Sequence, residues 1–247
     1  YWPMNPDSIQ SYNRWMRANF FDHVNIPAES IHIPRGDIPL EEVDAFCEDY
    51  EREIDKYGGI QLQLLGIGRT GHIGFNEPGS SRNSLTRLVT LDPQTRTDAA
   101  SGFFGEENVP LQAITMGVGT ILAAKKIIIM ALGEHKASII RKSVEGEVTD
   151  EIPATYLQKH PSATFVIDEA SASHLTAVKT PWLVGHCEWT PKLEKRAVIW
   201  LSRTVNKPLQ KLCSTDFIEH HLHELLRACG PIEAIRQRVF ESLLGGL

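Results

Sequence analysis

The chain has 247 residues, of which 42% are hydrophobic, 23% charged and 8% aromatic. This composition is typical of a globular protein with one large domain, or one domain with a substantial appendage. The net charge of −6 argues against the basic surface that nucleic-acid binding normally requires. No apolar run approaches the roughly 18–20 residues that cross a bilayer. We therefore expect neither a nucleic acid nor a membrane as a partner.

Cysteine usage indicates a reducing compartment. The four cysteines form no Cys-x-x-Cys pair and are too sparse for a disulfide framework, which is typical of reduced, mostly buried thiols. No signal peptide is recognisable at the start of the sequence. These observations predict a cytoplasmic protein.

The first half of the sequence predicts helices and short strands. Residues 8–21 have helical character, and residues 31–33 form a candidate strand. After Pro39, apolar residues recur every three or four positions as far as Tyr57, which predicts an amphipathic helix closed by two glycines. An apolar run at residues 60–65 then predicts a strand. Weaker strand candidates follow at residues 88–91 and 113–116.

Residues 126–132 are the clearest strand. Their unbroken run, Lys-Ile-Ile-Ile-Met-Ala-Leu, predicts burial on both faces of a parallel sheet. Residues 134–144 are predicted to form the next helix, residues 163–167 another buried strand, and the chain up to residue 178 a short helix. Because strands alternate with helices, the sequence predicts an α/β fold with an open, mainly parallel sheet and flanking helices.

The composition changes after Lys179, so we expect separate regions at residues 1–179 and 180–247. Apolar spacing in the second region predicts a first helix that includes residues 217–226 and ends at Gly230, and then a second helix. The second region therefore reads as a helical extension or an interdomain segment. Three tryptophans are expected to pack there rather than to bind a ligand: Trp182, Trp189 and Trp200.

A glycine-rich loop follows the predicted strand at residues 60–65. Gly66, Gly68 and Gly71 have no Cβ and tolerate positive φ, so the backbone can approach a ligand closely. The Gly-x-Gly-x-x-Gly pattern alone indicates a dinucleotide site only weakly, because that site should open a long helix. Here Asn-Glu-Pro-Gly follows soon after Gly71 and prevents a long helix from starting there. A nucleotide is therefore rejected, and no other cofactor is expected.

His72 and Glu77 lie on the same loop and are the main candidates for chemistry. Imidazole exchanges protons near neutral pH, and a nearby carboxylate orients it, so the pair suits proton transfer. The alternative is a structural histidine bonded to the backbone. Because open α/β sheets bind ligands at the carboxyl ends of their strands, we interpret the pair as functional.

Lys136 lies at the turn between the strand at residues 126–132 and the next helix. A cation in the first turn of a helix opposes the helix dipole, typically by a few tenths of a kcal/mol. An anion bound at that turn would make the lysine favourable, because the anion attracts both its charge and the free N–H groups of the helix. We therefore interpret Lys136 as a phosphate ligand, against the alternative of a solvated lysine.

A metal site is not expected. His220 and Glu224 have the spacing of two ligands on one helix face. No third ligand is visible near them in the sequence, and both belong to the polar side of an amphipathic segment.

The run at residues 71–81, Gly-His-Ile-Gly-Phe-Asn-Glu-Pro-Gly-Ser-Ser, strongly resembles the signature of glucosamine-6-phosphate deaminases. The resemblance covers roughly residues 1–178. The related 6-phosphogluconolactonases share the glycine–histidine turn but lack Asn-Glu-Pro, so a lactonase-like hydrolase is the second choice. Further matching segments are residues 19–27, 116–120, 132–137 and 154–161.

The resemblance implies a Rossmann-like domain that converts glucosamine 6-phosphate and water to fructose 6-phosphate and ammonia without a redox cofactor. It implies that His72 moves a proton between the ring and anomeric oxygens, that Glu77 supports it, and that Lys136 binds the substrate phosphate. Gly66 and Gly68 are placed in the substrate-binding turn. A phosphorylated amino sugar is the expected ligand, and a homo-oligomer the expected assembly.

Two departures from the family pattern concern the predicted site. Thr70 stands where the family usually has an aspartate of the ring-opening relay. Thr70 is still counted among the predicted catalytic residues, but a threonine cannot supply the negative charge of a carboxylate. A phosphate-binding arginine is expected before the paired phenylalanines, where Ser101 and Gly102 stand instead. Arg69 is the candidate substitute.

Part of the family domain would precede Tyr1: a first strand, a phosphate-binding loop and the aspartate that acts as base at C2. We therefore expect the chain to belong to a longer polypeptide, with a second domain as in the longer bacterial relatives. The alternative from another class is a sugar-phosphate sensor that keeps the pocket without catalysis. Thr70 and the missing base favour that alternative.

Overall fold

The computed structural model describes residues 1–245 and divides into two compact units, Tyr1–His174 (unit 1) and Leu175–Leu247 (unit 2). The division lies just before the boundary expected at residue 179. Among residues 1–245, none of the helices combines the length and the apolar character of a membrane span.

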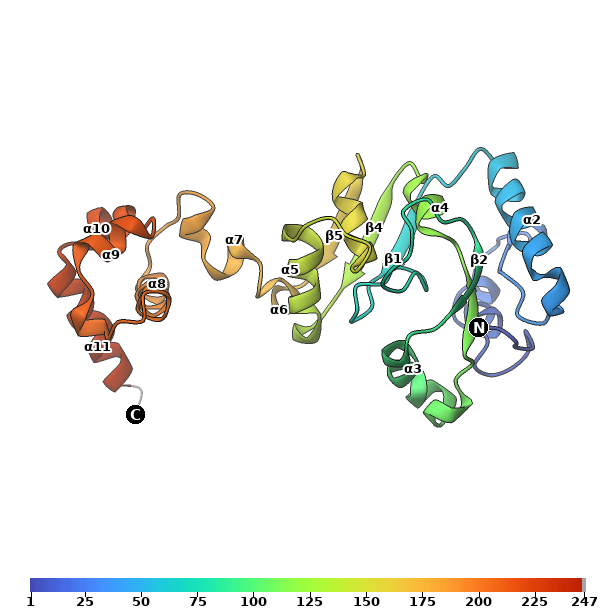
Figure 1. The fold of residues 1–247 in the computed structure, drawn as a ribbon, viewed down its shortest axis with the longest axis horizontal. Helices are drawn as coiled ribbons and strands as arrows, with labels where there is room; N and C mark the ends of the chain where they lie inside the picture. The colour runs from blue at the N-terminus through green and yellow to red at the C-terminus, as the bar shows by residue number, and fades with distance from the viewer. Residues whose placement is uncertain (246–247) are drawn as a thin grey trace. The chain divides into compact units, whose positions relative to one another are not determined.

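A three-stranded parallel sheet forms the centre of unit 1 (Figure 1). Its strands, in spatial order, are β1 (Gln63–Gly66), β4 (Ile127–Ala131) and β5 (Ala163–Ile167). Leu64 pairs with Ile128, and Ile129 with Phe165. The predicted parallel sheet is confirmed. Its strands end at a common edge, where β1 runs into the glycine-rich loop.

The two faces of this sheet differ in burial. Successive side chains of a strand alternate between the faces, and on one face Leu65 and Ile129 are buried. On the other face Leu64, Met130 and Val166 remain 60%, 44% and 45% exposed. The prediction of burial on both faces is therefore wrong. An apolar run identifies a strand, but burial of each face depends on what packs against it.

Helices alternate with the strands of unit 1. Helix α5 begins after a 3-10 turn, Glu134–Lys136, and contributes buried Ile139 and Ile140. The helices predicted at residues 43–57 and 134–144 are confirmed, whereas the one predicted at 8–21 is shorter because it begins only after its N-cap, Ser11. The helices of unit 1 are α1 (Tyr12–Asn19), α2 (Val43–Lys56), α3 (Pro93–Ala99), α4 (Val118–Leu122), α5 (Ala137–Glu145) and α6 (Glu169–Ala172).

The two weaker strand candidates form a pair of their own. Strands β2 (Arg87–Thr90) and β3 (Gln112–Thr115) are antiparallel, with Leu88 opposite Ile114, and they lie outside the parallel sheet. The strand predicted at residues 31–33 is wrong. That segment takes no regular secondary structure, because no described strand pairs with it.

In the part that the structure describes, unit 2 consists of helices joined by loops, without a strand. Its core includes the fully buried Leu201, Phe217 and Leu225, and the ring of Trp182 lies 5.5 Å from that of Trp200. The helices are α7 (Thr176–Lys179), α8 (Pro191–Thr204), α9 (Ser214–Glu219), α10 (His223–Cys229) and α11 (Ile232–Leu244).

The single helix predicted around residues 217–226 is wrong, because the chain breaks between α9 and α10. His221 has a left-handed φ of 61°, which interrupts the helix. Ile218 is consequently 58% exposed, whereas Leu222 in the break remains buried. The apolar spacing continues across the break, which is why the sequence did not reveal it.

Candidate active site

The loop after β1 folds back on itself through its own backbone. The N–H of Gly68 donates to the carbonyl of His72, and the N–H of Gly71 to that of Gly68, both at 3.0 Å. Gly71 has a φ of 86°, which glycine adopts most easily. Gly68 is needed for another reason, since a Cβ there would lie less than 3.0 Å from the ring of His72. The glycines therefore let the imidazole lie directly against the loop backbone.

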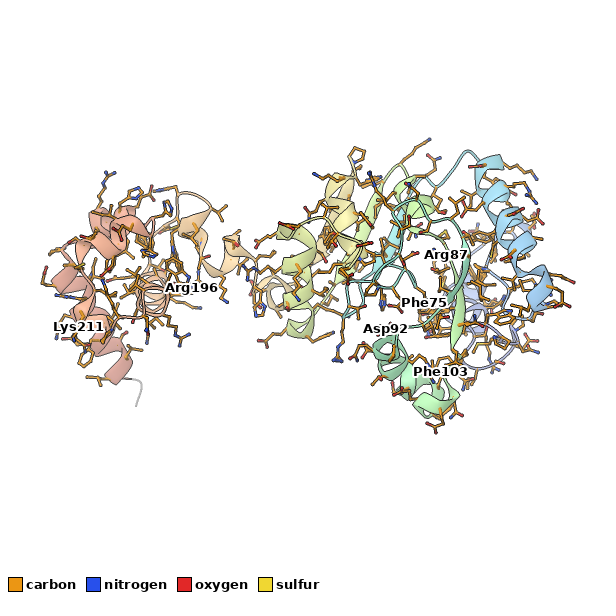
Figure 2. All side chains as sticks on the ribbon, viewed as in Figure 1. Phe75, Arg87, Asp92, Phe103, Arg196 and Lys211 are labelled. Carbon is orange, nitrogen blue, oxygen red and sulfur yellow. The ribbon has the colours of Figure 1, made fainter. Side chains whose placement is uncertain are left out.

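Asn76 fixes the second half of this loop. It is fully buried, and its Nδ2 donates to the carbonyls of Ile73 at 2.9 Å and Met116 at 2.8 Å. Its Oδ1 accepts from Nη1 of Arg87 at 2.9 Å, a residue labelled in Figure 2. Glu77 follows directly and is positioned by this anchor. Asn76 was not predicted as a site residue, although its place in the Asn-Glu-Pro run of the family signature could have indicated it.

His72 and Glu77 are brought together as predicted. Nδ1 of His72 lies 3.0 Å from Oε2 of Glu77, and their side chains are 15% and 12% exposed. Burial by itself raises the pKa of Glu77. The His72 ring, the hydroxyl of Thr95 and the N–H of Asp92 stabilise the ionised form more strongly, so the pKa is lowered overall. Glu77 is therefore an ionised acceptor beside the imidazole at neutral pH.

Two hydroxyl groups reach the same imidazole nitrogen. Oγ1 of Thr70, from the loop, lies 3.0 Å from Nδ1 of His72, and Oγ1 of Thr95, from α3, lies 3.3 Å from it. The N–H of Asp92, at the start of α3 (Figure 2), donates to Oε1 of Glu77 at 3.3 Å. Sequence reasoning missed Thr95 and Asp92. No local motif marks them, and the Thr95 contact spans 23 positions.

Lys136 reaches the glycine loop from the turn after β4. Its Nζ donates to the carbonyl of Ile67 at 2.8 Å. Burial lowers the pKa of Lys136, with a smaller opposing effect from Asp98. An ammonium group has three protons, so two remain for another acceptor. The loop and the β4 turn meet because β1 and β4 are neighbours in the sheet.

A cavity of about 580 Å³ opens over this edge of the sheet. Of the predicted site residues, its wall includes Gly66, Gly68, His72 and Lys136. A Cβ at Gly66 would meet only open space. Arg69 is not on the wall; it is 54% exposed and its Nη1 lies 3.1 Å from Oδ1 of Asp98, which does line the cavity. An acid–base group and a cation thus face one chamber of the size that small ligands occupy.

The histidines of unit 2 do not form a metal cluster in residues 1–245, where no group of three or more His, Cys, Asp or Glu side chains could hold an ion. His220 and Glu224 lie on either side of the helix break. Nδ1 of His220 contacts the carbonyl of Asp216 at 2.9 Å, while Glu224 pairs with Nδ1 of His186 at 3.1 Å.

The fold and the site define an α/β protein whose sheet edge places a glutamate-paired histidine and a lysine on the wall of one cavity. Comparison with known families makes this class more specific. The family model described as glucosamine-6-phosphate isomerases/6-phosphogluconolactonase matches residues 3–166. The chain belongs to this family.

Curated relatives and solved structures agree with the family. A protein of Bacteroides thetaiotaomicron, described as glucosamine-6-phosphate deaminase-like, is 43% identical over 243 residues, which are 98% of this chain and 37% of that protein. The glucosamine-6-phosphate deaminase of Thermoanaerobacter pseudethanolicus is 47% identical over 170 residues, 69% of this chain and 66% of that enzyme. A solved monomeric glucosamine-6-phosphate deaminase has a TM-score of 0.68 at 41% identity, covering 70% of this chain and 71% of that one.

The chain spans well under half of the Bacteroides relative and about two thirds of the Thermoanaerobacter enzyme. More distant solved structures include a 6-phosphogluconolactonase from Thermotoga maritima, with a TM-score of 0.51 at 22% identity. That likeness shows the fold alone.

Proposed function

We propose that the protein containing this chain is a glucosamine-6-phosphate deaminase, which converts glucosamine 6-phosphate and water to fructose 6-phosphate and ammonia. One observation carries the proposal: His72 and Lys136 line the same cavity, and Nδ1 of His72 lies 3.0 Å from Oε2 of Glu77 behind that wall. The deaminases among the relatives support the substrate class.

In this proposal His72 opens the sugar ring. It passes a proton between the anomeric hydroxyl and the ring oxygen, acting first as base and then as acid. Glu77 is ionised and partly buried, so it stabilises the imidazolium that forms between the two transfers. Thr70 contacts the nitrogen of His72 that faces Glu77 and therefore supports the orientation of the ring.

Lys136 is proposed to bind the substrate phosphate. Its ammonium group keeps two protons for phosphate oxygens after its bond to Ile67. Gly66 leaves the adjoining wall free of a side chain, and Gly68 makes room there for the ring of His72. Arg69 would contribute only after its ion pair with Asp98 opens, because the arginine lies off the cavity wall.

A cytoplasmic location, a homo-oligomeric assembly and a longer multidomain parent are also proposals. The length of the Bacteroides relative, of which this chain covers 37%, supports the longer parent. The solved deaminase is described as monomeric, so that relative gives the homo-oligomer no support.

Ammonia release from glucosamine 6-phosphate by the complete protein tests the proposal. General acid–base groups typically contribute about 100- to 10,000-fold, so His72→Ala should lower kcat/KM by that factor. Lys136→Met should act mainly by raising KM, because it removes a phosphate contact. His23→Ala changes an exposed histidine whose ring contacts the carbonyl of Ala18, and serves as the control.

An unchanged rate in His72→Ala would refute the assignment. Tight binding of glucosamine 6-phosphate without turnover by the unmutated protein would select the sensor instead, and hydrolysis of 6-phosphogluconolactone would select the lactonase.

A further inference from the structure

Helix α3 contacts the His72–Glu77 pair from outside the glycine loop. The hydroxyl of Thr95 lies 3.3 Å from Nδ1 of His72, and the N–H of Asp92 donates to Oε1 of Glu77 at 3.3 Å. Thr95 is only 6% exposed. A hydroxyl at that depth requires a hydrogen-bond partner, and the pair provides one. A second element, distant in sequence, therefore shares in holding the acid–base group.

The partners of Nδ1 determine which imidazole nitrogen carries the proton. The pKa of Glu77 is lowered despite burial, and an ionised carboxylate only accepts hydrogen bonds. Nδ1 of His72 lies 3.0 Å from Oε2 of Glu77, an approach of the two groups without an aligned hydrogen bond. A lone pair on Nδ1 would face the negative charge, so the neutral ring should carry its proton on Nδ1. Nε2 makes no hydrogen bond with any side chain or backbone group of residues 1–245 and is left as the basic nitrogen. The ring itself lines the cavity.

The hydroxyl of Thr95 suits this arrangement because it both donates and accepts. It accepts from Nδ1–H of His72 or donates to the carboxylate of Glu77, and a methyl group in its place does neither. If the proton moved to Nε2, the lone pair of Nδ1 would face the carboxylate of Glu77 at 3.0 Å, which is unfavourable between side chains that are only 15% and 12% exposed.

We propose that Thr95 is a positioning residue that acts through His72 and Glu77. Its hydroxyl helps to hold the imidazole in the Nδ1–H tautomer, and Nε2 is thereby presented to the cavity as the proton acceptor. The inference deepens the proposed deaminase function and rests on it for the catalytic consequence. The tautomer itself is a property of the protein without substrate.

Long-range ¹H–¹⁵N spectra of the histidine rings, recorded on the chain labelled with ¹⁵N-histidine, test the proposal. The unmutated chain should show His72 as the Nδ1–H tautomer. Thr95→Val keeps the shape of the side chain without the hydroxyl, and should raise the ratio of Nε2–H to Nδ1–H roughly tenfold, the size expected for one hydrogen bond. Thr95→Ser, which keeps the hydroxyl, should restore the original ratio.

Thr97→Val is the matched control on the same helix, because the Thr97 hydroxyl bonds to the carbonyl of Pro93 and to Glu106. It should leave the His72 signals unchanged. In the complete enzyme, Thr95→Val should lower kcat with little change in KM, and Thr95→Ser should recover it.

Three results would overturn the inference: an Nε2–H tautomer in the unmutated chain, a ratio in Thr95→Val equal to that of the unmutated chain, or an equal change in Thr97→Val. The first needs no variant, so the inference stays testable even where Thr95→Val fails to fold. Failure of the proposed function would appear separately, as an unmutated complete protein that releases no ammonia.

Discussion

Gly68→Ala is a direct test of how the loop holds the imidazole. A Cβ at this position would lie less than 3.0 Å from Cε1, Nε2 and Nδ1 of His72. Because protein interiors are close-packed, the ring must move by roughly 1 Å to make room. That movement separates Nδ1 from Oε2 of Glu77, which lie 3.0 Å apart in the unmutated protein.

The expected cost follows from this displacement. Overpacking of a well-filled site typically destabilises a protein by about 1–3 kcal/mol. Gly68 is not among the residues with positive φ, so backbone strain adds nothing to that figure. If the pair carries the chemistry, misplacing it by this distance should also lower kcat/KM about 100-fold.

Urea denaturation, histidine-ring NMR and ammonia release give three independent readouts. Gly102→Ala is the control: a Cβ there meets nothing within 4 Å, and the residue is exposed in the same unit. Its free energy of unfolding should change by no more than about 0.5 kcal/mol. The reasoning fails if Gly68→Ala is as stable as this control and its His72 resonances are unshifted.

Two further predictions concern unit 2. Hydrogen bonds from Lys207 and the N–H of Cys213 lower the pKa of Asp216 from 3.8 to about 2, so its stabilising contribution is complete above about pH 4 and is lost as the pH falls toward 2. Thermal melts from pH 5 to 2 should show a smaller acid-induced decrease of the melting temperature in Asp216→Asn than in Glu219→Gln. The second variant is the control, because it changes an exposed carboxylate on the same helix. Equal decreases of the melting temperature would contradict the linkage. Leu201→Ala removes a fully buried side chain and should destabilise unit 2 by about 2–5 kcal/mol. Calorimetry should then show a lower melting temperature for the transition of unit 2 and an unchanged one for unit 1. A joint shift of both transitions would mean that the units do not unfold independently.

The centre of the candidate site could be predicted because its information is local. His72 and Glu77 lie on one loop directly after a strand, and Lys136 follows a second strand whose apolar run was unmistakable. Neighbouring parallel strands bring such loops together at their carboxyl edge. Thr95 could not be found in this way, because its place beside His72 depends on where the chain returns after β2.

The errors in the predicted fold have a common physical origin. Residues 31–33 have the residue types of a strand, but a strand needs a partner, which local pattern does not provide. The run in β4 correctly identified a strand, yet Met130 is exposed because burial depends on distant packing. The break at His221 was hidden because Leu222 remains buried across it.

The uncovered face of the parallel sheet makes the stability of unit 1 conditional. Leu64, Met130 and Val166 come from three adjacent strands, and β1 and β5 are the edge strands of the described sheet, so exposed apolar side chains lie at its edges. Such surfaces associate readily with other apolar surfaces. Full burial of an exposed apolar side chain contributes about 1.5–3 kcal/mol. Covering these half-exposed side chains would contribute about half of that each, and whatever binds only the folded state raises its melting temperature by mass action. The melting temperature of unit 1 is therefore a joint property of the domain and its surroundings, and it should rise with the concentration of anything that shields this face.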